Sequence, residues 1–352
     1  MDVIVNERNV VMNRRQWMGW LLAVVAGGSM FVGGVAQAAD DVSVQLDWLV
    51  RGNHAMFFVA RDNGYFKEQG INVTAIRKGT GSTDALKLVA NGNADFGFGD
   101  LPTLQVGRSQ KLPVVALVAV NQESPLAMIS LKAKHPMSKP ADMKGMNIGV
   151  HPSGSTYVFL KAFFAKNGLN LADFKQSTVS PPYENMLLLG RVDLVPGYID
   201  AEVPELEAKA GGPGSLSILH GSDFGYDAYG SGVFTSEKMI AEKPELVQRF
   251  VNAYAKAFQF VVEHPKEAVD IVVKANPEYK GKEHTLMAQL DADIKSTFFG
   301  PYTKTHGIGA MSDKQWTATA QVLKEQGMLP ADFNAAGGFN SSFIEKAGAL
   351  KR

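Results

Sequence analysis

The chain has 352 residues, which is enough for about two domains with large cores. Hydrophobic residues make up 45% and charged residues 20%, as in a globular protein rather than a disordered or fibrous one. Its 35 basic and 35 acidic residues cancel, so the sequence shows no electrostatic footprint for nucleic acid. It has no cysteine, which excludes disulfides, cysteine–zinc sites, thiol nucleophiles and a lipidated cysteine.

The segment 1–38 predicts a cleaved export signal. Arg14 and Arg15 precede an uncharged stretch, 16–39, that is rich in apolar and small residues. Because an A-x-A sequence occupies 36–38, we expect cleavage after the second alanine of that sequence. The stretch is also long enough for an uncleaved membrane anchor, but its glycines and its small-residue end favour cleavage.

Two details of export are left open by the sequence. The arginine pair resembles a twin-arginine signal, while the general export route fits equally well. Translation from Met12 instead of Met1 would keep the whole signal. Without a cysteine to carry a lipid, we expect the mature protein to be free in a periplasm and not a lipoprotein.

Strand-like and helix-like segments alternate from residue 42 onwards. Residues 42–49 alternate apolar and polar side chains as a half-buried strand does, and 55–69 carry apolar residues at helical spacing. The alternation continues through the segments 71–77, 82–90, 94–99, 101–109 and 114–120. Such a succession predicts a parallel sheet with helices on both faces.

A second series begins near Leu126. Its strands and helices are expected at 147–150, 157–167, 192–199 and 204–210. From Pro244 the chain becomes strongly helical and carries one apolar stripe, which predicts a core-facing helix. The stripe consists of Leu246, Phe250, Ala253, Tyr254, Ala257 and Phe258.

No catalytic or cofactor motif is present. The sequence lacks a P-loop, a G-x-G-x-x-G after a strand, H-E-x-x-H and G-x-S-x-G. Its seven histidines never stand three or four residues apart, so the usual local spacing of a metal site is missing. We therefore expect no catalytic residue, no metal and no cofactor.

Binding features are better supported, because three polar turns stand where a strand ends and a helix begins. They are 47–54, 79–83 and 153–156, and open α/β sheets hold their ligands at such places. The candidate contacts in the last two turns are Gly81, Ser82, Ser153, Ser155 and Thr156. Simple N-capping of the following helices is the alternative for each serine and threonine.

Two tyrosines stand beside carboxylates, Tyr183 next to Glu184 and Tyr198 close to Glu202. This pairing suits an aminated heteroaromatic ring, because the tyrosine stacks on the ring and the carboxylate accepts from its N–H groups. Two alternatives stay open: Glu202 caps the helix that follows, or Trp48 of the first turn is only part of the core.

Four stretches carry a resemblance to a known family. They are "LDWLVRGNHAMFFVARDNGYFKEQGINV" at 46–73, "NGNADFGFGD" at 91–100, "ADMKGMNIGVHPSGS" at 141–155 and "LLGRVDLVPGYIDAE" at 188–202. Together with 231–278, 306–316 and 323–330, they make the chain similar to the periplasmic substrate-binding proteins of ABC importers. The group resembled takes up nitrate, sulfonates, taurine and thiamine-pyrimidine precursors, and includes the NMT1/THI5-like proteins.

The resemblance implies an α/β fold of type II with two lobes, each built on a doubly wound mixed sheet and joined by hinge crossovers. Lobe 1 is expected at 40–125 plus 232–352, and lobe 2 at 126–231. Members of the family do no chemistry: they close on a small solute and present it to a permease that works with an ATPase. We expect a monomer that binds no nucleic acid.

The Asp-Trp and Asn-His pairs resemble members that bind pyrimidine-like or other heteroaromatic ligands. This implies that Trp48 and Tyr198 stack on the ring, while Asn53, His54 and Glu202 bond its edge. The two Ser/Thr turns would receive polar or anionic substituents. Asp100, which ends the second matching stretch, completes the expected site.

Arg51 departs from the family pattern, because Leu49-Val50-Arg51-Gly52 replaces a run like T-P-N-T. It adds a cation that can select an acidic or phosphorylated ligand. One alternative function is therefore the binding of an aliphatic sulfonate, nitrate or another small organic anion. The other is a pyrimidine-precursor synthase, against which the missing cysteines and the export signal both count.

Overall fold

The computed structural model describes residues 38–180 and 184–351, and the chain from Ala39 onwards forms one compact unit. The predicted export signal therefore lies outside the described residues, apart from Ala38. Among the helices that are described, none is long and apolar enough to cross a membrane.

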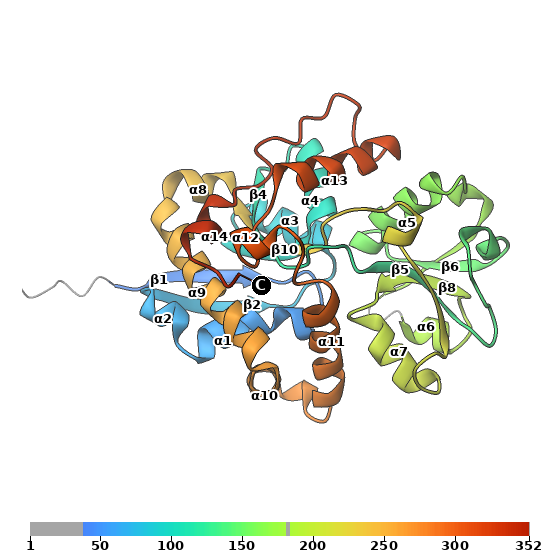
Figure 1. The fold of residues 1–352 in the computed structure, drawn as a ribbon, viewed down its shortest axis with the longest axis horizontal. Helices are drawn as coiled ribbons and strands as arrows, with labels where there is room; N and C mark the ends of the chain where they lie inside the picture. The colour runs from blue at the N-terminus through green and yellow to red at the C-terminus, as the bar shows by residue number, and fades with distance from the viewer. Residues whose placement is uncertain (1–37, 181–183, 352) are drawn as a thin grey trace, which may run out of the picture. The chain divides into compact units, whose positions relative to one another are not determined.

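The first of two five-stranded sheets has the strand order β2-β1-β3-β10-β4. Its strands are β1 (Asp40–Gln45), β2 (Ile71–Arg77), β3 (Phe96–Asp100), β4 (Val114–Ala119) and β10 (Ser231–Ser236). β1 pairs in parallel with both neighbours, whereas β10 runs antiparallel between β3 and β4. A strand from far along the chain thus completes the first sheet (Figure 1).

The second sheet has the order β7-β6-β8-β5-β9. It is formed by β5 (Leu126–Leu131), β6 (Asn147–Val150), β7 (Lys175–Thr178), β8 (Leu194–Tyr198) and β9 (Leu216–His220). β5 runs antiparallel to β8 and β9, while β6 pairs in parallel with β7 and β8. Both sheets are therefore mixed, as the family resemblance implies. The parallel sheet that the local alternation favours is interrupted by β5 and β10, which run antiparallel to their neighbours.

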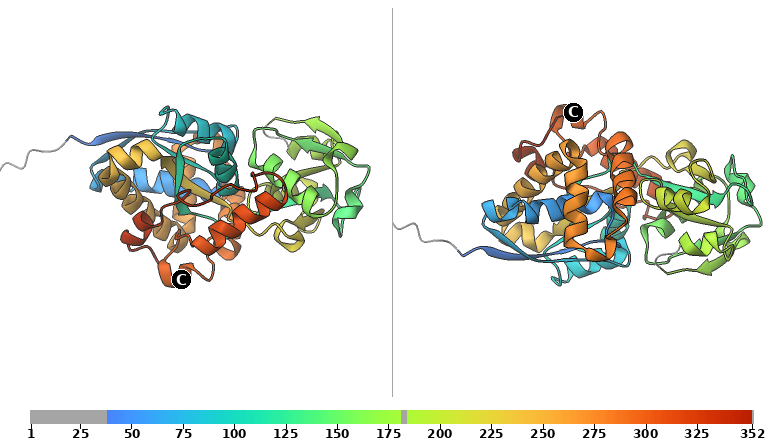
Figure 2. Two further views of the ribbon diagram at one scale, coloured as in Figure 1. Left: turned by 90° about the horizontal axis from the view of Figure 1, so that it is seen from above. Right: turned by 90° about the horizontal axis from the view of Figure 1, so that it is seen from below.

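Two connections join the sheets, one between β4 and β5 and the other between β9 and β10 (Figure 2). We call the part of the chain around the first sheet lobe 1 and the part around the second lobe 2. The two-lobed, mixed α/β fold is confirmed. The lobe boundaries at 125/126 and 231/232 stay a prediction.

The helices flank the two sheets. Those before the second connection are α1 (Ala55–Asp62), α2 (Tyr65–Glu68), α3 (Ser82–Ala90), α4 (Leu101–Ser109), α5 (Ser155–Lys166), α6 (Glu184–Leu188) and α7 (Glu202–Ala210). Those after β10 are α8 (Glu237–Glu242), α9 (Pro244–Glu263), α10 (Pro265–Ala275), α11 (Glu283–Ser296), α12 (Thr303–His306), α13 (Asp313–Glu325) and α14 (Ser342–Lys346).

Two local predictions differ from the structure. The helix expected over 55–69 is broken after Asp62, because Gly64 adopts a left-handed φ of 79° and α2 starts afresh behind it. The strand expected over 42–49 ends at Gln45, and the residues that follow form the turn before α1.

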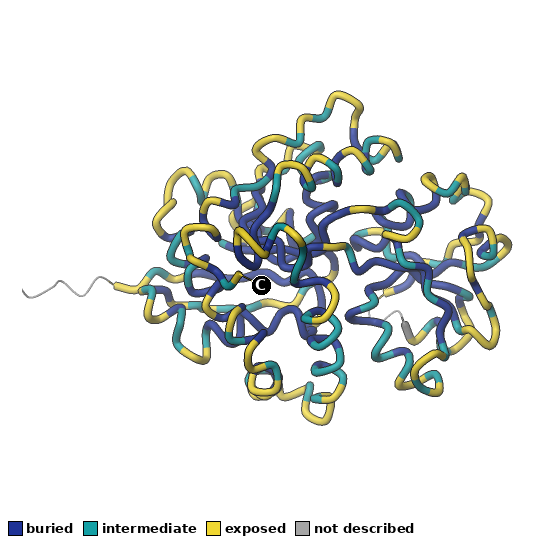
Figure 3. The backbone as a smooth tube through the Cα atoms, in the orientation of Figure 1, coloured by how far each residue is buried: buried dark blue, intermediate teal, exposed yellow. Residues whose placement is uncertain are grey.

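The core of lobe 1 lies under α9. All six residues of the predicted apolar stripe are buried, and the ring of Phe250 stacks on Phe96 of β3 at 3.6 Å between centroids. The prediction of a core-facing helix is thereby confirmed. Figure 3 shows the buried backbone concentrated in the strands, with exposed residues mainly in outer loops and helices.

Candidate functional site

The turn between β1 and α1 is packed tightly into the protein. It contains a short 3₁₀ helix, Gly52–His54, that lies against α11. A Cβ on Gly52 would come within 2.6 Å of the backbone nitrogen of Leu290, so only glycine fits this contact. The Gly52 N–H donates to Oε1 of Gln289 at 3.2 Å, which fixes the turn to the same helix.

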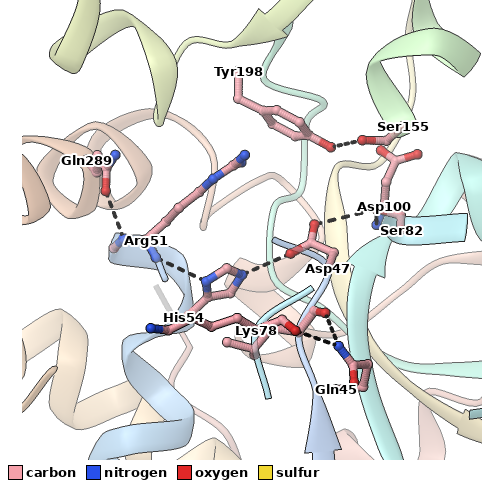
Figure 4. A network of polar contacts seen from close by, with 12 residues as sticks. Gln45, Asp47, Arg51, His54, Lys78, Ser82, Asp100, Ser155, Tyr198 and Gln289 are labelled. Atoms are coloured by element: carbon pink, nitrogen blue, oxygen red, sulfur yellow. Dashed lines mark hydrogen bonds and ion pairs between the residues drawn. The ribbon is translucent and has the colours of Figure 1, made fainter. Parts of the chain in front are cut away.

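His54 uses both ring nitrogens inside the protein. Its Nδ1 accepts from the Arg51 N–H at 3.1 Å, so its Nε2 carries the proton and donates to Oδ1 of Asp47 at 3.0 Å (Figure 4). Burial lowers the pKa of His54, in agreement with this neutral form. The arrangement holds the Asp47 carboxylate in a fixed direction.

Asp47 lies near Ser82, the first residue of α3, and Asp100, the last residue of β3. The Ser82 hydroxyl lies 3.5 Å from Oδ2 of Asp47 and accepts from the Asp100 N–H at 3.1 Å. Oδ2 of Asp100 accepts from both the N–H and the hydroxyl of Thr103, at 2.8 and 2.6 Å, and so caps α4. Oδ1 of Asp100 is buried without a hydrogen-bond partner among the described residues, and burial raises the pKa of this carboxyl to about 7.

Lobe 2 contributes the opposite wall. The Ser155 hydroxyl and the Tyr198 phenol are hydrogen-bonded at 2.6 Å, and the N-cap of α5 is Gly154, without a side-chain cap. Gly81, also without a side-chain cap, takes that position for α3. Ser82 and Ser155 therefore do not serve as N-caps here, which removes the simple capping alternative for these two residues.

Arg51 lies between the aromatic side chains of both lobes. Its guanidinium carbon is 5.7 Å from the ring centroid of Trp48 and 5.0 Å from that of Tyr198. Its Nη2 donates to Oε1 of Glu202 at 2.8 Å, and Oε2 of Glu202 accepts from the Tyr198 N–H at 2.7 Å. Both the Arg51 and the Glu202 side chains are largely buried in this ion pair.

Two cavities adjoin this ion pair. The inner cavity has a volume of about 10 Å³ and is lined by Asp47, Trp48, Arg51, Gly81, Ser82, Gly154, Ser155, Thr156 and Tyr198. The neighbouring pocket has about 270 Å³ and shares Trp48 and Arg51 with it. Its other walls come from α7, α11 and the segment around Tyr279.

The structure gathers most of the predicted residues from both lobes. Trp48 lines both cavities and also packs in an apolar cluster with residues of lobe 2, so its predicted core burial and its place at the cavity coexist. The predicted residues that do not line the inner cavity are Asn53, His54, Asp100, Ser153 and Glu202, and of these Glu202 lines the neighbouring pocket. Tyr183 lies outside the described residues, and Glu184 is described only as the start of α6.

Sequence reasoning missed four polar residues. Asp47 stands in the first polar turn, where no pattern in the sequence distinguishes it as a site residue in its own right. Asp200 of lobe 2 and Asp293 of α11 are both buried, and burial raises the pKa of both carboxyl groups. The neighbouring Asp200 raises the pKa of Asp293 further. Gln289 donates to the Ala201 carbonyl at 3.0 Å, and no local pattern in α11 marks it.

In the described part of the chain, no group of three or more histidine, cysteine, aspartate or glutamate side chains is arranged to hold a metal ion.

Two binding proteins are similar to this chain over most of its length. A formylaminopyrimidine-binding protein of Halalkalibacterium halodurans is 26% identical over 308 residues, which cover 87% of this chain and 91% of that protein. The riboflavin-binding protein RibY of Chloroflexus aurantiacus is 24% identical, with 87% and 86% covered.

Among solved structures, the alkanesulfonate-binding protein SsuA of Xanthomonas axonopodis pv. citri, bound to MOPS, matches with a TM-score of 0.66. It is 14% identical and covers 87% of this chain and 100% of that one, so the likeness shows the fold. The profile described as NMT1/THI5 like matches residues 51–268, more than half of the sequence. The chain belongs to the NMT1/THI5-like family and has the two-lobed fold of periplasmic binding proteins.

Proposed function

We propose that the protein is the solute-binding receptor of an ABC importer and that it captures a small, pyrimidine-like heteroaromatic compound between its lobes. The observation that carries this proposal is that Trp48, Tyr198 and Glu202 all contact one flat group, the guanidinium of Arg51. Two aromatic faces and a carboxylate acceptor around one flat group are what a ring with N–H donors requires. The formylaminopyrimidine- and riboflavin-binding relatives support the same ligand class.

The acidic character of the site also favours a ligand with N–H donors. Besides Glu202, the carboxyl groups of Asp47 and Asp100 lie at or beside the inner cavity. The charge of Arg51 is paired with Glu202, so it does not make the cavity attractive to an acidic ligand. We propose that His54 acts through Asp47, which it orients, and that Asn53 assists from the same turn.

Closure of the lobes is the event that the permease would recognise. Contacts between the lobes already form beside the site: the Nε2 of His151 lies 2.7 Å from the Thr80 carbonyl, and Gln289 reaches the Ala201 carbonyl. A ligand that contacts both lobes stabilises this closed form, which is how binding shifts an open–closed equilibrium.

We further propose that the mature chain, from residue 39, works in the periplasm as a monomer, together with a permease and its ATPase. The export signal of 1–38 and the binding-protein relatives support this assignment. The general and twin-arginine routes both remain compatible with the sequence.

A small organic anion is the second candidate ligand. The first turns of α3 and α5 both face the inner cavity through Ser82, Ser155 and Thr156, and helix N-termini favour anions. The sulfonate-binding SsuA structure shares the fold and so makes this ligand worth testing. A synthase is disfavoured, because the cysteine-rich motif that the resemblance implies for those enzymes is missing.

The test is a thermal-shift and calorimetric screen of the mature protein with pyrimidines, flavins, aromatic acids, sulfonates and nitrate. A specific ligand raises the melting temperature by mass action. We expect an aminated heteroaromatic to do so, and Trp48→Ala and Glu202→Gln to weaken its binding at least tenfold. Glu242→Gln, an exposed position on α8, is the matched control.

Two results would count against this function. Unchanged affinity in both site variants would refute the assignment of the site. A sulfonate or nitrate that binds tightly, and depends on Ser155 more than on Trp48, would establish the anion receptor instead.

A further inference from the structure

In this structure, the group that contacts the rings of both Trp48 and Tyr198 is a side chain of the protein itself, the guanidinium of Arg51. The Arg51 guanidinium is flat, cationic and rich in N–H donors. It contacts Trp48, Tyr198 and Glu202, the three residues that the proposed function assigns to the ligand. Arg51 thus presents to the site the same chemistry as an aminated heteroaromatic ring.

The inner cavity leaves no room for a second group of that size. Its volume of about 10 Å³ is close to the minimum for a single water molecule, whereas ligand pockets usually exceed roughly 300 Å³. The turns on either side are already in contact, since a Cβ on Gly81 would lie 2.5 Å from the Ser153 carbonyl oxygen. With the lobes closed in this way, a ring can occupy the place between Trp48 and Tyr198 only if Arg51 leaves it.

The neighbouring pocket offers Arg51 a place to go. Arg51 lines both cavities, and its long, unbranched side chain can exchange between them by rotating its χ angles. The larger pocket, of about 270 Å³, is lined by two carboxylate residues, Glu202 and Glu205. Glu205 is ion-paired with Lys209 at 2.6 Å and half-buried, and it can accept a guanidinium as well.

We propose that Arg51 is a resident occupant of the ring site and that the imported ligand binds by displacing it into the neighbouring pocket. This inference rests on the proposed function and narrows its ligand class. Glu202 is buried, and when Arg51 moves its Oε1 loses a charge-assisted hydrogen bond while its Oε2 keeps the one from the Tyr198 N–H, so the loss is costly. Only a flat ligand that offers N–H groups to Glu202 replaces what Arg51 supplied, so amino- or amidine-bearing rings are selected and sulfonates are not.

The experiment uses the mature chain with Arg51→Ala and two probes, methylguanidinium and 4-aminopyrimidine, measured by calorimetry. Removing the occupant should raise the affinity for both probes at least tenfold over wild type. Arg51→Ala combined with Glu202→Gln should lose this gain, because the acceptor is gone. Arg61→Ala, a half-buried arginine on α1, is the matched control and should behave as wild type.

Arg51→Lys keeps the experiment decisive if the alanine variant does not fold. Lysine preserves a positive charge for Glu202 but lacks the flat donor group, so a gain of at least threefold for 4-aminopyrimidine is expected. Equal or weaker probe binding in the folded variants would overturn the inference and make Arg51 a direct ligand contact.

The two proposals fail separately. If methylguanidinium binds Arg51→Ala in a manner that depends on Glu202, while no heteroaromatic binds any variant, Arg51 is the occupant but the proposed ligand class is wrong. If wild type binds a heteroaromatic tightly and Arg51→Ala gains nothing for either probe, the proposed function stands and the occupant does not.

Discussion

Substituting Asp100 by asparagine tests the electrostatics of the site through protein stability. The Asp100 side chain is buried beside the inner cavity, and burial raises its pKa from 3.8 to about 7. The folded protein therefore holds the proton more tightly than the unfolded chain. The stabilisation from this proton is complete below the unfolded pKa near 3.8 and is lost as the pH rises towards 7.

The size of the effect follows from the shift of the pKa. A change of about three units corresponds to roughly 4 kcal/mol, of which about 3 kcal/mol is lost between pH 5 and 8. Asparagine cannot ionise, and its amide oxygen can still accept the two hydrogen bonds from Thr103. Between pH 5 and 8, we therefore expect the free energy of unfolding of Asp100→Asn to fall by about 3 kcal/mol less than that of wild type.

Urea unfolding of the mature protein at pH 5 and pH 8 measures this difference. Asp223→Asn, an exposed aspartate near β9, controls for the general effect of removing a carboxylate. If wild type and Asp100→Asn change in parallel, to within about 1 kcal/mol, Asp100 is ionised at neutral pH and the argument from burial is wrong.

Three further predictions rest on other contacts. Burial and the neighbouring Asp200 raise the pKa of Asp293. At pH 9, Asp293→Asn should therefore have a higher melting temperature than wild type. His54→Ala removes the hydrogen bonds that His54 makes with the Arg51 N–H and with Asp47. Its free energy of unfolding should be about 2–4 kcal/mol lower than that of wild type, and calorimetry should show weaker ligand binding. Phe250→Ala should lower the free energy of unfolding by about 3–5 kcal/mol while the ligand affinity of the folded protein stays unchanged.

Much of the fold could be predicted because periodicity reports what each segment packs against. The apolar stripe of α9 is one example, since helical spacing alone places its residues on one face against a sheet. The break at Gly64 was not foreseen, because the apolar spacing continues across the glycine. The insertion of β10 between β3 and β4 was equally out of reach, since strand pairing across more than a hundred residues leaves no local pattern.

The site was predictable in its location more than in its chemistry. Polar turns at the ends of strands converge at one edge of each sheet, and this geometry brings Ser82 and Ser155 to the same cavity. The pairing of Arg51 with Glu202, 151 residues away, depends on the side-chain conformation and on closure of the lobes. From the sequence alone, Arg51 is expected to attract an acidic ligand. In the folded protein its charge is paired with Glu202, so that expectation does not follow.

Competition between Arg51 and the ligand separates affinity from selectivity. Every ligand that enters the ring site must displace the same guanidinium, so this step lowers all affinities by a common factor. Only a ligand with N–H donors then restores a partner to Glu202, so the preference for aminated rings depends on that carboxylate. Changes at Arg51 should therefore shift the affinities for aminated rings together, and changes at Glu202 should reorder them relative to other rings. If Arg51 were simply a ligand contact, its substitution would change both the affinities for aminated rings and their order relative to other rings.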